Sequence, residues 1–277
     1  MTLLVTSAAG ANGTGYGKIL AFADDGTLID VFGSDPRIAD PRGLAIDPVD
    51  RLLFVNSGSD RILALDHNGK VVRASKAMQG LNPGGGNFGP GGRYYVGLRG
   101  ERTIMAFARE LDRAGETILP PRVVPFPRGF AFGHDGRLFL ASGIGPGGEG
   151  DNTILAFDSD RRMLPSWKVT DPELSSLDLA IAPSGNIVVS SEHPFGAGNA
   201  VTTIREYDHA HGRLVRVLVP KYGVRFRKPR GLRFGPHDRL YCVAQEEVVV
   251  FDLDTGDCLG AVAKLPRLNG QAVIFFP

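Results

Sequence analysis

Residues 40–65 read Asp-Pro-Arg-Gly-Leu-Ala-Ile-Asp-Pro-Val-Asp-Arg-Leu-Leu-Phe-Val-Asn-Ser-Gly-Ser-Asp-Arg-Ile-Leu-Ala-Leu. Three short apolar runs are separated here by Pro, Gly, Asp and Ser, which favour tight turns. A fourth run follows the turn Asp-His-Asn-Gly at 66–69. The pattern predicts four short strands. The first run is apolar on both faces, which indicates a strand that is buried on both sides.

The third of these runs recurs along the chain. Close copies lie at 17–22, 102–107 and 152–157, and looser ones at 202–207 and 247–251. A four-stranded repeat of about 40–50 residues is typical of a β-propeller blade. The copies therefore predict six blades. Their anchor residues are spaced 43, 42, 50, 50 and 44 apart: Ile19, Ile62, Ile104, Ile154, Ile204 and Val248.

The two ends of the chain complete the count. Residues 2–6 match the second strand of the unit, whereas residues 271–277 match an inner strand with nothing after it. Pairing the two would close the ring and remove both free sheet edges, whereas an open array of hairpins would leave both unpaired. We therefore expect an all-β, six-bladed propeller with four-stranded blades, forming one domain over 1–277.

Composition excludes several classes of protein. The net charge is +1, so no overall field favours nucleic acid or a membrane. No apolar run approaches the roughly 20 residues that span a bilayer. Residues 1–6 do not resemble a signal peptide. Cys242 and Cys258 are expected on the second and fourth strands of one blade, too far apart to bridge. We expect a cytoplasmic protein, with an exported chain that has lost its leader as the alternative.

The unit at 40–62 resembles the NHL repeat and the related YWTD-type propeller repeat. The likeness recurs in Pro-Arg-Gly-Phe-Ala-Phe at 127–132 and Pro-Arg-Gly-Leu-Arg-Phe at 229–234, and it covers nearly the whole chain. Propellers of this kind include sensor domains, RNA-binding domains, lyases and lactonases, so the resemblance implies a fold and leaves the function open.

The enzymes of this group imply site residues that the chain matches poorly. The amidating lyases hold zinc with several histidines, but here only His193 is expected at the binding end. The streptogramin lyases carry a His-x-Glu sequence, which does not occur. The regucalcin-like lactonases use a first-strand Glu, which is missing, although Asn87 and Asp178 imitate part of the set.

Arginine precedes the inner strands of alternate blades. Arg42, Arg128 and Arg230 are each followed by Gly and are expected around the mouth of the central channel. Arginine suits paired contacts with carboxylate or phosphate, so one hypothesis is a site for a small anionic molecule or a peptide segment. The other is that each Arg braces an Asp between blades. Asn56 and Gln271, expected at the same end, complete the predicted ligand-binding set.

Three long loops are expected at that end, over 7–17, 142–151 and 191–201. The third contains Glu192-His193, a candidate general base or metal ligand. An enzymatic alternative, a lyase or lactonase-like hydrolase, would use Glu192 and His193 as catalytic residues. A divalent metal ion would then bind Asn87, Asp178 and Glu192.

Residues 213–233 contain eight Lys and Arg and no acidic residue, with Tyr222 and Phe226 among them. Such spacing can bind single-stranded RNA through phosphate contacts and stacking. A solvated strand and linker is the simpler interpretation, and the one favoured by the balanced net charge.

Overall fold

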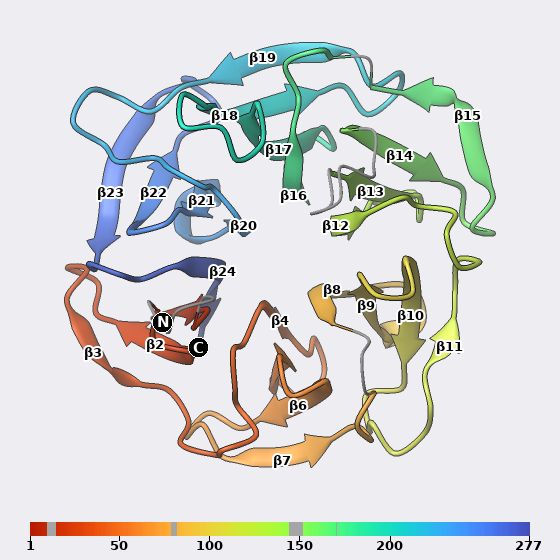
Figure 1. Cartoon of the computed structure of the whole chain (residues 1–277), viewed down its shortest axis with the longest axis vertical. Helices are drawn as coiled ribbons and strands as arrows, with labels where there is room; N and C mark the ends of the chain where they lie inside the picture. Colours follow the sequence, from red (N-terminus) through yellow and green to blue (C-terminus); the bar gives the residue numbers. More distant parts are fainter. Residues whose placement is uncertain (10–14, 79–81, 144–151, 170) are drawn as a thin grey trace.

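The structure is a computed structural model that describes all of residues 1–277 except 10–14, 79–81, 144–151 and 170. The described residues form six four-stranded antiparallel sheets arranged around a central axis (Figure 1). The predicted six-bladed propeller is confirmed. Blade 1 comprises β24 (Gly270–Phe276), β1 (Thr2–Ser7), β2 (Lys18–Phe22) and β3 (Leu28–Val31). Blade 2 comprises β4 (Gly43–Ile46), β5 (Leu53–Ser57), β6 (Arg61–Leu65) and β7 (Val71–Ala74). Blade 3 comprises β8 (Pro83–Phe88), β9 (Tyr94–Leu98), β10 (Thr103–Phe107) and β11 (Glu116–Thr117).

The remaining blades follow the same order from the axis outward. Blade 4 comprises β12 (Pro127–Phe132), β13 (Leu138–Ser142), β14 (Thr153–Phe157) and β15 (Met163–Lys168). Blade 5 comprises β16 (Ser176–Ile181), β17 (Ile187–His193), β18 (Val201–Tyr207) and β19 (Leu214–Leu218). Blade 6 comprises β20 (Leu232–Phe234), β21 (Leu240–Val243), β22 (Glu247–Phe251) and β23 (Cys258–Lys264). The helical residues described are two short 3₁₀ turns, Pro90–Gly92 and Pro236–Asp238. Within the described chain, no helix has the length and apolar character needed to cross a membrane.

The ring closes by pairing the two ends of the chain, as the sequence predicts. Strand β24 lies antiparallel to β1, with Thr2 opposite Phe276 and Leu4 opposite Ile274. The side-chain hydroxyl of Thr6 also accepts a hydrogen bond from the backbone N–H of Ala272, at 2.9 Å. Both terminal strands therefore gain a hydrogen-bonded neighbour that the open chain would lack.

The hydrophobic core is divided among the interfaces between blades. One cluster, for example, joins Leu4 and Ile19 of blade 1 to Leu44 and Val55 of blade 2. The other five clusters each combine residues of two neighbouring blades in the same way. Because each sheet packs on both sides, strands such as β5 are buried along their whole length, which explains their lack of a polar face.

The two cysteines lie where the repeat predicts. Cys242 is on β21 and Cys258 on β23, with β22 between them, and both are free thiols.

Candidate anion-binding site

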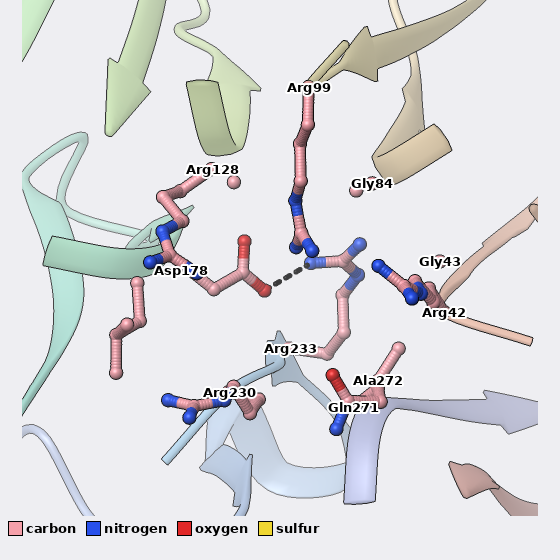
Figure 2. Close-up of a pocket in the computed structure, with 13 residues that line it drawn as sticks. Arg42, Gly43, Gly84, Arg99, Arg128, Asp178, Arg230, Arg233, Gln271 and Ala272 are labelled. Atoms are coloured by element: carbon pink, nitrogen blue, oxygen red, sulfur yellow. Dashed lines mark ion pairs between the residues drawn. The ribbon is translucent and has the colours of Figure 1, made fainter. Parts of the chain in front are cut away.

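A cavity lies at the axis, at the end of the ring where the inner strands begin (Figure 2). The cavity volume is about 40 Å³, which is room for a few waters or one small charged group. All six blades contribute to its wall. The lining residues are Arg42, Gly43, Gly84, Gly85, Arg99, Arg128, Gly129, Leu177, Asp178, Arg230, Arg233, Gln271 and Ala272.

The Pro-Arg-Gly sequence sets the spacing of the inner strands. A Cβ atom on Gly129 would lie 1.7 Å from Oδ1 of Asp178 in the next blade, and one on Gly231 would lie 2.6 Å from the Cα of Ala272. A Cβ atom on Gly43 would lie 2.9 Å from the carbonyl oxygen of Gly84 in the next blade. Glycine is required at these positions because neighbouring strands meet there.

Irregular pairing aims several side chains at the cavity. The register of β12 against β13 shifts between Pro127 and Phe130, so Arg128 and Gly129 lie in a bulge. Similar shifts occur at Leu177 on β16 and at Gln271 on β24. A bulge turns a side chain away from the direction that regular alternation would give it.

The three arginines predicted from the repeat all line the cavity, each with different neighbours. Arg42 pairs with Asp40 at 3.1 Å and donates to Oδ1 of Asn82 at 2.9 Å. Arg230 lies 3.4 Å from the buried carboxylate of Glu192. The Arg128 guanidinium stacks 4.6 Å from the centre of the Phe126 ring and 4.8 Å from that of Phe195. Arg42 thus pairs with an Asp of its own segment, whereas Arg230 of blade 6 pairs with Glu192 of the neighbouring blade 5, a contact between blades of the kind that the bracing hypothesis expects.

Two further arginines, which the repeat does not predict at the site, complete the lining. Arg233 crosses the channel from β20 and donates to the carbonyl oxygens of Leu44 on β4 and Gly86 on β8, at 3.3 and 3.4 Å. Its Nη1 also faces Oδ2 of Asp178 at 3.7 Å. One signal in the sequence pointed to it: the other Pro-Arg-Gly copies have Ala45 and Ala131 at this position.

Arg99, at the end of β9, carries the least compensated charge of the group. Its Nε is buried and has no hydrogen-bond partner in the described part of the chain. Burial, together with the charges of Arg128, Arg42 and Arg230, lowers the pKa of Arg99 to about 9. Burial and Arg230 likewise lower the pKa of Arg128 to about 10. The cavity therefore holds positive charge that the surrounding protein does not fully balance.

Asp178 is placed among these cations. Burial raises its pKa, although Arg233 and the backbone N–H of Leu232 favour the charged form. That N–H donates to Oδ2 at 2.9 Å. Gln271 lines the cavity as well, and its Nε2 donates to the carbonyl oxygen of Asn269 at 3.1 Å.

Other predicted site residues lie elsewhere. Asn56 is buried behind the cavity wall, where its Nδ2 donates to the carbonyl oxygen of Gly84 at 2.7 Å and its Oδ1 accepts from the hydroxyl of Tyr94 at 2.9 Å. Its side chain therefore contacts β8 and β9 and is not among the described residues that line the cavity. Asn87 lies further along β8, opposite Tyr95, and is not part of the cavity lining.

The two predicted catalytic residues, Glu192 and His193, contact different neighbours. Glu192 is buried against Arg230, whereas Nδ1 of His193 lies 3.2 Å from the hydroxyl of Ser175. Of the predicted metal ligands Asn87, Asp178 and Glu192, only Asp178 lines the cavity. The described residues contain no group of three or more His, Cys, Asp and Glu that could hold a metal ion.

The basic segment 213–233 does not form one surface. Phe226 is buried against Phe251, and Arg230 and Arg233 face the cavity. Tyr222 is fully exposed. Of the predicted long loops, 7–17 and 142–151 include residues outside the described part of the chain. The third is shorter than expected, because β17 continues to His193 and β18 begins at Val201.

Comparison with known proteins supports the fold. No protein-family model matches the chain, and no curated protein matches it in sequence. A chain in the crystal structure of a nidogen/laminin complex is similar, with a TM-score of 0.74 at 16% identity over 98% of this chain and 97% of that one. A gluconolactonase from Xanthomonas campestris gives 0.63 at 16% over 96% and 86%, and a streptogramin B lyase gives 0.63 at 13% over 87% and 74%. At such identities the likeness supports the propeller fold of this chain and nothing about its function.

Proposed function

We propose that this propeller binds a small anionic ligand in the arginine-lined cavity. The observation that carries the proposal is Arg99, a cation that lies beside three other arginines and whose buried Nε has no hydrogen-bond partner among the described residues. Unpaired buried charge is costly to a fold, so its presence in a cavity favours a ligand that supplies the opposite charge. Five guanidinium groups can offer the paired donors that carboxylate and phosphate accept. The small volume favours a compact anion over a peptide segment.

A divalent metal ion does not suit this set of side chains. Asp178 is the one carboxylate among the described lining residues, and Arg233 faces it at 3.7 Å. A cation placed there would be repelled by the five guanidinium groups around it. RNA is also less well supported, because Phe226 of the basic segment is in the core and cannot stack on a base.

Kinship with the NHL-type propellers is part of the proposal, and it rests on the repeated Pro-Arg-Gly segments. A lyase or lactonase-like activity is the alternative, because similar structures include a streptogramin B lyase and a gluconolactonase. Metal analysis of the purified protein separates the two, since an enzyme that uses Asn87, Asp178 and Glu192 as metal ligands requires bound metal. The two free cysteines support a reducing compartment, and we propose the cytoplasm.

Replacing Arg99 by Gln tests the anion site. Inorganic phosphate at about 100 times its Kd should stabilise the wild-type protein by about 2.7 kcal/mol. For a chain of this size, that raises Tm by about 5 °C. We expect Arg99→Gln to lose most of this response. Without phosphate the variant should melt at or above the wild-type temperature, because it removes a charge that the folded state holds unfavourably.

Arg113→Gln provides the matched control, since its side chain is 85% exposed and makes only a distant ion pair. Phosphate also stabilises proteins generally by exclusion from their surface, and the control retains that effect. A purely structural role for Arg99 predicts the opposite result: a lower Tm without phosphate and an unchanged phosphate response.

A further inference from the structure

A carboxylate is unexpected in the wall of an anion site. Among the described residues lining the cavity, Asp178 is the one acidic side chain. Its Oδ2 is already engaged, because it accepts from the backbone N–H of Leu232 at 2.9 Å and faces Arg233 at 3.7 Å. These contacts explain how Asp178 is held, but they use only one of its two oxygens.

The other oxygen is available to a ligand. Oδ1 of Asp178 lies against Gly129, where a Cβ atom would approach it to 1.7 Å, and neither the hydrogen bond from Leu232 nor the ion pair with Arg233 uses it. The side chain remains 17% exposed. In Figure 2 this oxygen points away from the ion pair with Arg233, on the side of Arg99. The side chain is therefore positioned to accept a hydrogen bond inside the cavity.

Gln271 offers a second acceptor. Its Nε2 donates to the carbonyl oxygen of Asn269, which leaves its Oε1 on the cavity side (Figure 2). The wall thus combines guanidinium donors, which match the oxygens of an anion, with two acceptors that match a donor.

We propose that the anion bound here carries a hydrogen-bond donor beside its negative charge, and that Asp178 accepts that hydrogen bond. This inference rests on the proposed function. An oxyanion without a proton would place its lone pairs and charge against the Asp178 carboxylate, which is repulsive. An anion with an O–H group places a donor there instead and leaves its other oxygens to the arginines. Asp178 is then a specificity-determining residue that rejects anions lacking a donor.

Inorganic phosphate and sulfate make a sharp test because they have the same shape. At about pH 8 both are dianions, but phosphate retains one P–OH group whereas sulfate has no proton. We expect isothermal titration of the wild-type protein to give phosphate at least roughly tenfold higher affinity than sulfate, the effect of one hydrogen bond to a charged group. In Asp178→Asn the amide can still accept from Leu232 and can offer an N–H to the cavity, so the preference should fall to less than about threefold, mainly through tighter sulfate binding.

Asp24→Asn serves as the control, because Asp24 is exposed in the turn between β2 and β3. It should keep the wild-type preference. Equal affinities of the wild-type protein for phosphate and sulfate would overturn the inference while leaving the anion site intact. Failure of both anions to bind would overturn the proposed function itself. The wild-type comparison needs no variant, so the inference remains testable even if Asp178→Asn folds poorly.

Discussion

Asp171 shows how one side chain secures the connection between two blades. It lies between β15 and β16, and its Oδ2 accepts from Nη1 of Arg205 at 2.6 Å and from the hydroxyl of Tyr207 at 2.7 Å. The Asp171 and Arg205 side chains are only 8% and 6% exposed. Buried ion pairs of this kind contribute little beyond their desolvation cost, but removing Asp171 leaves the buried Arg205, among the ion pairs described, with the exposed Glu173 at 2.9 Å alone.

Asp171→Ala should therefore lower the free energy of unfolding by about 3 kcal/mol. Burial alone would raise the pKa of Asp171, but hydrogen bonds from Tyr207 and the Glu173 N–H, with the Arg205 charge, lower it below the ordinary value of 3.8. The contribution is thus complete above the unfolded-state pKa and disappears as pH falls through the lower folded-state pKa. Denaturant melts from neutral to acidic pH should show the difference in free energy of unfolding between the two proteins narrowing as pH falls below the ordinary pKa of Asp.

The exposed Asp160 provides the comparison for this prediction. It is 69% exposed and lies 3.8 Å from Arg162, so Asp160→Ala should change the free energy of unfolding by less than about 0.5 kcal/mol. A wild-type advantage over Asp171→Ala that stays constant into acid would contradict the ionic origin of the effect.

Strand β24 is the element on which the ring depends most. It covers the edge of β1 and supplies Val273 and Phe276 to the two core clusters on either side of blade 1. It also brings Gln271 to the cavity. Strand β24 thus closes the ring, contributes to the core and lines the candidate site, so its loss is expected to damage all three.

A chain ending at Gly270 should lose cooperative thermal unfolding and any response to phosphate, because blade 1 would have an open edge and two incomplete interfaces. A chain ending at Phe276 is the control, since it lacks only the exposed Pro277. Circular dichroism melts of both proteins test this. A cooperative transition of the shorter chain at the full-length temperature would show that the ring does not need its last strand.

Contacts between residues that are distant in sequence hold the whole ring together. The accessibility of the Cys242 thiol shows whether the ring stays closed. Cys242 is fully buried in the cluster between blades 5 and 6, whereas Cys258 is partly exposed. Burial also raises the pKa of the Cys242 thiol well above its ordinary value, which keeps it unreactive. Access to this thiol therefore requires blades 5 and 6 to separate or the chain to unfold.

In a Cys258→Ser variant, thiol labelling of Cys242 should be slower than in the unfolded chain by a factor of roughly 10³ or more, as expected for a site opened by global unfolding. The rate should rise with denaturant along the unfolding transition. In a Cys242→Ser variant, Cys258 should react readily without denaturant. Labelling of Cys242 in buffer as fast as in denaturant would mean that the ring opens locally between blades 5 and 6.

Sequence alone determined the architecture of this protein. Strand positions, the six-fold repeat and the pairing of the two ends follow from apolar runs and turn residues, which are local signals repeated along the chain. The positions of Arg42, Arg128 and Arg230 at the cavity follow from the same repeat, because equivalent residues of equivalent blades must lie around one axis.

Tertiary structure alone decided which other side chains meet at that axis. Arg99 and Arg233 enter the cavity, whereas Asn56 turns into the wall and Phe226 into the core. These directions depend on strand bulges and on how closely neighbouring blades approach, which no single repeat encodes. The balance of charge in the cavity is likewise a sum over six blades. It becomes visible only when residues separated by most of the chain are brought within a few ångströms of one another.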